Sequence, residues 1–365
     1  MRHRAWLVAV GGSGLPRHGS TLVSEPLTGE AWTQFRLAVR HQRLSGLAVQ
    51  AADAGELPVT DKQREELVGE HLKEMAHALR LERHIVGIAE VLEPHGIAFI
   101  VLKGSAVAHL DYENPTLRSY ADVDLLFRPE QLDRALDIVI AAGYERQVPP
   151  LNSGFDRRFG KGATLRSTDD YEIDVHRTFA MGPFGHTVDL DDLWDRPAAF
   201  PIAGRDISAL ATEQRMIHAC FHAVVGNPHD RVQPRRDVAE MFLFGAYDSE
   251  RVLELAHRWQ AQAVVATALT DAWELFGVAP RLPLVDWAAS RIPTRREVRM
   301  MSVYDGRTSY ATKSLASLMV IPWRDRLTFL RMLTAPDTSF LQAQAQGRSR
   351  AYWLVRGTFR AIRHR

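Results

Sequence analysis

The sequence has little cysteine, no long apolar run and almost no net charge. Only Cys220 is a cysteine, so no disulfide can form within the chain and no four-cysteine zinc site exists. This lone cysteine fits the reducing cytoplasm, which is the location we expect. No stretch approaches the ~20 apolar residues of a transmembrane helix, so none is expected. The net charge of +1 argues against a protein that wraps nucleic acid, so nucleic acid is not an expected partner.

The rest of the composition is ordinary for a globular protein, with 46% hydrophobic and 24% charged residues. A length of 365 residues predicts more than one structural unit. Residues 1–29, rich in Gly, Ser and Pro, are expected to be a loosely ordered arm. We expect a helical region over 30–95, a mixed α/β core over 96–210 and a helical domain over 211–365.

The change of periodicity along the chain predicts the individual elements. Apolar residues at helical spacing predict a long helix that starts near Thr60 or Asp61 and ends at about Glu93. The core is predicted to contain strands at 97–102 and 121–127, helices at 104–110 and 129–142, and a β-hairpin formed by 163–167 and 171–177. Further helices are predicted at 212–225, 236–245, 249–270, 324–333 and from 349 to the end.

Three acidic residues stand out in the core. Asp122 and Asp124 are two positions apart on a predicted strand, so both carboxylates face the same side. Two adjacent carboxylates repel each other, and a divalent cation removes that penalty. Oxygen ligands of this kind suit Mg²⁺, which is commonly bound by carboxylates together with substrate phosphates. Asp174 lies on another predicted strand and is a candidate third carboxylate.

The segment before these acids has the pattern of a phosphate-binding turn. Gly104 and Ser105 follow a strand and open a helix, where backbone N–H groups can meet a phosphate. Lys103 and Arg118 add positive charge nearby, and each is a candidate phosphate contact. Alternatively, Lys103 is a solvated residue at the end of a strand, and Arg118 caps a loop or pairs with Glu113. A second glycine-rich stretch, 11–14, has no Asp-x-Asp at a suitable distance after it, so we interpret it as a loop.

These segments, taken in order, resemble the nucleotidyltransferase superfamily of DNA polymerase β. They are VLKGSAVAHL at 101–110, LRSYADVDLL at 117–126 and YEIDVH at 171–176. The chain is more closely similar to a bacterial branch described only as nucleotidyltransferase family proteins, and the likeness extends to HACFH at 218–222 and RRD at 235–237. The resemblance implies an α/β (α+β) fold with a polymerase-β-like core and a mixed sheet, flanked by helical regions.

The resemblance also implies an activity, a Mg²⁺-dependent (or Mn²⁺-dependent) nucleotidyl transfer. Asp122 and Asp124 would hold the metal ions, Asp174 would complete the site for the attacking group, and Gly104 and Ser105 would contact the phosphates. The expected donor is an NTP, ATP foremost, and pyrophosphate would leave. The expected acceptor is a hydroxyl or phosphate of a small molecule or peptide, as in the tailoring of peptide natural products.

Two features depart from the pattern of the superfamily. Ser105 and Asp122 are 17 positions apart, which is longer than usual across the superfamily, although the branch shares this interval. The phosphate loop is therefore open to a different construction. Arg177 follows His176 where an aromatic residue is common in the branch, which implies a different acceptor pocket.

The histidines allow several interpretations. His176 shares a strand face with Asp174 and is a general base, an acceptor contact or a structural residue. His218 and His222 are one helical turn apart, but no Glu follows His218 as in a His-Glu-x-x-His zinc site, so we favour helix packing or a position facing the active site. In the second case His222 would face the acceptor or the triphosphate, together with Arg235 or Arg236. Cys220 is expected to be buried.

Two other functions remain open from the sequence. One is a catalytically inactive nucleotide- or peptide-binding protein of the same fold, which the presence of all three acids argues against. The other is a tRNA- or nucleic-acid-modifying nucleotidyltransferase, which the near-zero net charge argues against. The basic C-terminal helix, which has six arginines between 348 and 365, is either packed on the body or a surface for an anionic partner.

Overall fold

The computed structural model describes residues 2–17, 25–226, 230–304, 308 and 310–345. A sheet of seven strands lies at its centre, in the order β3-β4-β5-β2-β1-β7-β6. The strands are β1 (Ile100–Val101), β2 (Val123–Leu126), β3 (Glu145–Arg146), β4 (Gly162–Arg166), β5 (Glu172–His176), β6 (Ala198–Ile202) and β7 (Arg205–Ala209). The sheet is mixed, because β5 is parallel to β2 and β7 is parallel to β1 while the other neighbours are antiparallel. The expected mixed α/β class is confirmed.

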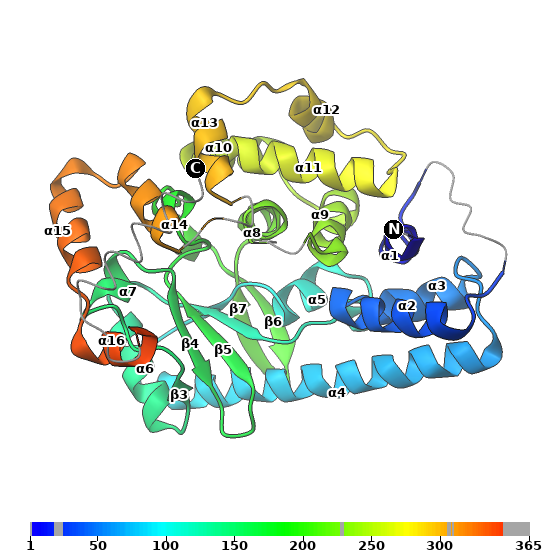
Figure 1. Ribbon diagram of the computed structural model, residues 1–365, viewed down its shortest axis with the longest axis horizontal. Coiled ribbons are helices and arrows are strands. Elements are labelled where there is room, and N and C mark those ends of the chain that lie inside the picture. Colours follow the sequence, from blue (N-terminus) through cyan, green and yellow to red (C-terminus); the bar gives the residue numbers. More distant parts are fainter. Residues whose placement is uncertain (1, 18–24, 227–229, 305–307, 309, 346–365) are drawn as a thin grey trace.

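Helices cover both faces of this sheet (Figure 1). The N-terminal helices are α1 (Arg2–Gly11), α2 (Gly29–Gln42), α3 (Ser45–Asp53) and α4 (Asp61–Leu92). The helices between strands are α5 (Ser105–Asp111), α6 (Leu132–Ala141) and α7 (Phe155–Arg158). The later helices are α8 (Thr212–Val224), α9 (Val232–Phe244), α10 (Ser249–Arg258), α11 (Gln262–Phe276), α12 (Pro283–Ser290), α13 (Arg295–Met301), α14 (Tyr310–Ala316), α15 (Trp323–Thr334) and α16 (Thr338–Ala345).

Strand alternation divides the core into two layers. Val101, Val123 and Leu125 pack with the buried side of α4, whereas Leu102 and Leu126 belong to the core that contains α8, α9 and α11. Figure 1 shows α4 along one face of the sheet and α8, α9 and α11 on the other. Because successive side chains of a strand point to opposite faces, Asp124 shares the face of Leu126. The acidic residues therefore face α8 and α9.

The long helix α4 has the start that the sequence predicts. Thr60 and Gln63 form a capping box, in which Thr60 Oγ1 accepts from the backbone N–H of Gln63 and Gln63 Oε1 accepts from that of Thr60. The helix runs for 32 residues to Leu92. The predicted hairpin is also confirmed, since β4 and β5 pair antiparallel.

The N-terminal residues differ from the predicted arm. Residues 2–11 form α1, which buries Trp6, Leu7 and Val10. The expectation was wrong because the short apolar run finds its partners in distant segments, among them Phe35 at 6.0 Å between the ring centroids of Trp6 and Phe35. Parts of the expected 30–95 and 211–365 regions, over 32–67 and 216–304, contribute to one core, whereas buried residues over 78–92 and 321–333 belong to two others. Their limits remain predictions.

Two further helices differ from their predicted bounds. The expected helix over 249–270 is divided into α10 and α11, because Gln260 between them adopts a left-handed φ of 53°. Helix α9 begins at Val232, four residues earlier than expected, with Pro234 in its first turn, where a missing N–H costs no hydrogen bond. The predicted helix from 349 and its arginines lie outside the described residues. None of the helices that are described has the length and apolarity of a membrane span.

Candidate active site

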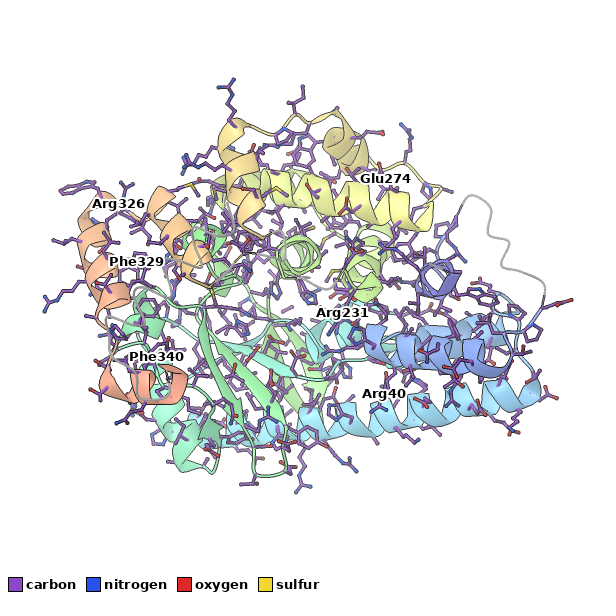
Figure 2. All side chains as sticks on the ribbon, in the orientation of Figure 1. Arg40, Arg231, Glu274, Arg326, Phe329 and Phe340 are labelled. Carbon is purple, nitrogen blue, oxygen red and sulfur yellow. The ribbon has the colours of Figure 1, made fainter. Side chains whose placement is uncertain are left out.

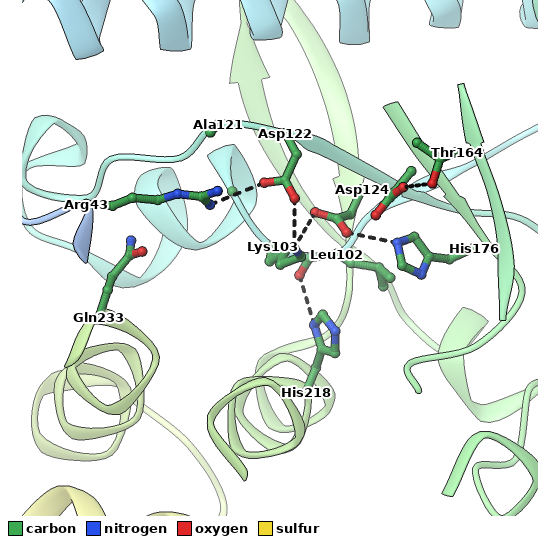
Figure 3. Close-up of polar contacts among 12 residues, drawn as sticks. Arg43, Leu102, Lys103, Ala121, Asp122, Asp124, Thr164, His176, His218 and Gln233 are labelled. Atoms are coloured by element: carbon green, nitrogen blue, oxygen red, sulfur yellow. Dashed lines mark hydrogen bonds and ion pairs between the residues drawn. The ribbon is translucent and has the colours of Figure 1, made fainter. Parts of the chain in front are cut away.

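The acidic residues come together where β2 and β5 lie side by side. Asp124 and Asp174 are register partners in this parallel pair, and Asp122 directly precedes β2. Asp124, Asp174 and His176 each offer a ligand atom, and these atoms all lie within 4.8 Å of one another. Thr164 Oγ1 on β4 donates to Asp174 Oδ1 at 2.7 Å, which orients that carboxylate (Figure 3).

Lys103 holds the two acids of the Asp-x-Asp pattern together. Its Nζ lies 3.2 Å from Asp122 Oδ2 and 2.9 Å from Asp124 Oδ2. Burial opposes its charge, but the two carboxylates outweigh that effect and raise the pKa of Lys103 above its usual value. Lys103 is therefore an ammonium group at the place where a cation offsets the repulsion between the carboxylates.

His176 contacts Asp124 from the other side. Its Nε2 lies 2.8 Å from Asp124 Oδ1, and both side chains are buried. Burial alone would raise the pKa of Asp124, but Lys103 and His176 outweigh it and hold that pKa well below its ordinary value. Among the described residues, His176 Nδ1 has no hydrogen-bond partner. Asp124 is thus ionised, with a cation and an imidazole beside it.

The Gly104-Ser105 turn lies between β1 and α5, as the sequence predicts. Gly104 has φ 59° and ψ −116°, a conformation that a residue with a side chain rarely adopts. Ser105 begins α5 and is buried. The first backbone N–H groups of a helix have no partners within it, so this turn is suited to a phosphate.

Arg118 lies in a different environment from the one that the sequence suggests. Its guanidinium donates to both oxygens of Asp237 in α9, through Nε at 2.9 Å and Nη2 at 2.8 Å. Its Nη1 donates to the carbonyl oxygen of Gly104 at 3.0 Å, and its exposed fraction is 3%. This geometry favours a loop-capping role over a phosphate contact, and the acidic partner is Asp237 and not Glu113. Arg118 instead ties the turn at Gly104 and Ser105 to α9.

Of the two histidines of α8, His218 is buried and His222, one turn later, is half-buried. The Nδ1 of His218 lies 3.3 Å from the carbonyl oxygen of Leu102, and its ring centroid lies 4.5 Å from that of Phe179. Burial lowers the pKa of His218 to about 3. Burial, with Lys103 and Arg118, also lowers that of His222 well below its usual value. Both rings are therefore neutral, and His218 lies against the backbone of Leu102, directly after β1.

A family model described as an uncharacterised nucleotidyltransferase matches residues 28–277. The chain belongs to this nucleotidyltransferase family. A search of curated proteins finds no match.

Distant likenesses exist among solved structures of other proteins. ANT(2")-Ia in complex with adenylyl-2"-tobramycin has 16% identity and a TM-score of 0.35, over 50% of this chain and 97% of its own. An antigenic nucleotidyltransferase-like protein from Paracoccidioides brasiliensis has 16% identity and a TM-score of 0.36, and the match covers 60% of this chain and 96% of that protein. The lincosamide antibiotic adenylyltransferase LnuA, lincomycin-bound, has 14% identity and a TM-score of 0.31, and the match covers 44% of this chain and 96% of that protein. Likenesses this distant identify no substrate for this chain.

Two predicted site residues of this nucleotidyltransferase are bonded elsewhere. Arg236 donates from Nη1 to the carbonyl oxygen of Gly11 at 3.0 Å and pairs with Glu240, so it supports the loop after α1. Arg235 pairs with Asp230 at 2.7 Å and lies 3.7 Å from Asp271. The structure does not bring either side chain to the carboxylates. Cys220 is buried, as expected.

Two residues near the carboxylates were missed by the sequence analysis. Arg43 Nη1 lies 3.5 Å from Asp122 Oδ1, and no local pattern marks this arginine. Glu172 begins β5 on the same alternation as Asp174, and burial, with repulsion from Asp174 and Asp122, raises its pKa. The alternation of Glu172, Asp174 and His176 was visible in the sequence and was a sufficient signal for the glutamate.

The donor set of this nucleotidyltransferase fits a divalent cation. Carboxylate oxygens dominate it, which suits Mg²⁺ or Mn²⁺, and an imidazole nitrogen completes the group within 4.8 Å. Asp122 extends the set on the side of Lys103.

Proposed function

We propose that the protein transfers a nucleoside monophosphate from an NTP, ATP foremost, to a hydroxyl or phosphate of a small molecule or peptide, with Mg²⁺ (or Mn²⁺) as cofactor. The observation that carries this proposal is the register of β2 and β5, which pairs Asp124 with Asp174 beside Asp122. In a family of nucleotidyltransferases, three carboxylates at one point of the sheet are the natural place for the reaction.

Each residue has a role in this proposal. Asp122 and Asp124 would hold the metal ions, which when bound would neutralise the triphosphate and lower the pKa of the acceptor. Lys103 and the turn at Gly104 and Ser105 bind the phosphates. The acceptor oxygen attacks the α-phosphorus, the bond to the bridging oxygen breaks, and pyrophosphate leaves with its electron pair.

Asp174 receives the proton of an acceptor hydroxyl. The hydrogen bond from Thr164 Oγ1 to Asp174 Oδ1 supports this role, because it fixes the carboxylate on the exposed side of the β4–β5 pair. His176 orients Asp124 through its contact at 2.8 Å. A phosphorylated or otherwise modified peptide from a natural-product pathway is the acceptor that we propose to test first.

The experiment is incubation of the protein with Mg²⁺ and each labelled NTP, with and without candidate acceptors. We expect pyrophosphate release that needs the metal and one preferred NTP and that rises when the right acceptor is added. The Asp124→Asn variant, which lacks one of the proposed metal ligands, is the negative control. Pyrophosphate release that is equal in the wild type and in Asp124→Asn would contradict the proposal.

A further inference from the structure

Arg43 reaches the acidic residues from outside the central sheet. It follows α2 directly and has a left-handed backbone, with φ 58° and ψ 44°, which a residue with a side chain adopts only at an energetic penalty. Its Nη1 lies 3.5 Å from Asp122 Oδ1, and its side chain is 27% exposed (Figure 3). The end of α2 therefore directs a solvent-accessible guanidinium at the metal-binding side of the site.

The start of α9 is hydrogen-bonded to the end of α2 and to the segment before Asp122. Gln42, next to Arg43, accepts from the backbone N–H of Val232 through Oε1 at 2.6 Å. Gln233 donates from Nε2 to the carbonyl oxygen of Ser119 at 2.8 Å, just before the Asp-x-Asp segment. Arg231, labelled in Figure 2, is the N-cap of α9 and so lies beside the end of α2.

Positive charge therefore gathers on one side of the carboxylates. Lys103 and Arg43 contact different oxygens of Asp122, and Arg231 stands next to Arg43 along the Gln42–Val232 contact. The other side carries Asp174 and Glu172. A metal ion on Asp122 would offset the charge that Arg43 now faces, and the guanidinium would then be available for an anion. The anion that arrives with the metal is the polyphosphate of the nucleotide.

We propose that Arg43 binds the β- and γ-phosphates of the nucleotide, so that the N-terminal helical region forms part of the nucleotide site. This proposal rests on the proposed function, since it concerns the same substrate. Arg43 exchanges Asp122 for the phosphates, and Arg231 adds positive charge to the same edge. Arg118 does not bind these phosphates, because its guanidinium is held by two hydrogen bonds to Asp237.

The test is calorimetric binding of ATP, ADP and AMP with Mg²⁺ and without acceptor. Arg43→Gln keeps a polar side chain, although a shorter one, and removes its charge. We expect affinity for ATP to fall ~10- to 100-fold, as for the loss of a charge-assisted hydrogen bond, and affinity for AMP to change less than ~2-fold. Arg43→Lys should recover part of the ATP affinity. Arg40→Gln, which changes an exposed arginine one turn earlier in α2, is the matched control and should bind ATP as the wild type does.

The outcomes separate this proposal from the function on which it rests. Unchanged ATP affinity in Arg43→Gln, with the wild type binding ATP, overturns the role of Arg43 alone. An equal loss for ATP and AMP also overturns it, because the effect then does not lie at the outer phosphates. Thermal melting of Arg43→Gln near that of the wild type excludes misfolding as the cause. A wild type that binds no nucleotide at all contradicts the proposed function itself.

Discussion

Two groups of charged side chains, one around α5, α8 and α9 and one at β2 and β5, differ in how completely they are paired. On the helical side, Arg118 and Arg215 each place two nitrogens on one carboxylate, those of Asp237 and Asp111. The distances in these two pairs lie between 2.7 and 2.9 Å. On the sheet side, Asp122 and Asp124 share Lys103, and Asp174 is the register partner of Asp124. The guanidinium of Arg43 lies 3.5 Å from Asp122.

The difference separates structural charges from charges that are suited to a ligand. A bidentate arginine–carboxylate pair satisfies both partners and leaves no place for an ion. Where carboxylates outnumber the nearby cationic side chains, part of the negative charge is uncompensated, and a divalent cation can neutralise it. The comparison therefore predicts that changes in the first group act on stability and changes in the second group act on catalysis.

The largest effect is expected from Asp124→Asn. Removing this charge takes away a metal ligand, so we expect kcat/KM to fall at least ~1000-fold, a loss of about 4 kcal/mol in transition-state stabilisation. The fold should persist, because Lys103 keeps Asp122 as a partner. Steady-state kinetics and a thermal melt check the two parts. Turnover at the wild-type level would remove Asp124 from the mechanism.

Asp111→Asn is expected to lower the stability of the fold and to leave catalysis almost unchanged. It leaves the buried guanidinium of Arg215 without its anion, which destabilises the fold by about 3 kcal/mol. Activity per folded molecule should change less than ~2-fold, since this pair does not touch the carboxylates of β2 and β5. Denaturant unfolding measures the loss. The double variant Asp111→Leu with Arg215→Met should recover most of the stability, because it removes both charges.

Asp237→Asn should show an intermediate effect, because its partner Arg118 also contacts the turn at Gly104 beside the second group. We expect a loss of about 2 kcal/mol in unfolding free energy, since Arg118 stays buried with a neutral partner. We also expect kcat to fall ~10-fold, because Arg118 Nη1 holds the carbonyl oxygen of Gly104. Steady-state kinetics measure the fall in kcat, and a thermal melting curve measures the loss of stability. A loss of stability with unchanged kcat would mean that the turn does not depend on the arginine.

The smallest effect concerns the pH dependence of His218. Its folded pKa of about 3 lies below the ~6.5 of an unfolded histidine, so the unfolded chain binds the extra proton first. The neutral ring contributes its full stability above pH ~6.5 and loses it as the pH falls, by up to ~1.4 kcal/mol per pH unit. His218→Asn keeps a donor for Leu102 but does not titrate. The stability advantage of the wild type should shrink between pH 7 and 5, as measured by urea unfolding, and an advantage that does not change with pH would contradict the buried neutral ring.

The sequence predicted the parts of the site that depend on local pattern. The alternation around Asp122 and Asp124 and around Asp174 and His176 is a property of single strands, and the capping box at Thr60 is a property of one helix start. The partner of Arg118 is Asp237, which is 119 positions away. The partner of Arg43 is Asp122, which is 79 positions away. No local pattern encodes such contacts, because they arise only when α2, α9 and the sheet pack together.

The most direct test of the central claim is Mn²⁺ binding in the presence of ATP, followed by electron paramagnetic resonance. The account predicts a protein-bound Mn²⁺ signal in the wild type and in Asp111→Asn. The same signal should be lost in Asp124→Asn and weakened in Asp174→Asn, because these carboxylates supply the ligands. A signal of equal strength in Asp124→Asn and the wild type would contradict the claim that the carboxylates of β2 and β5 are the metal site.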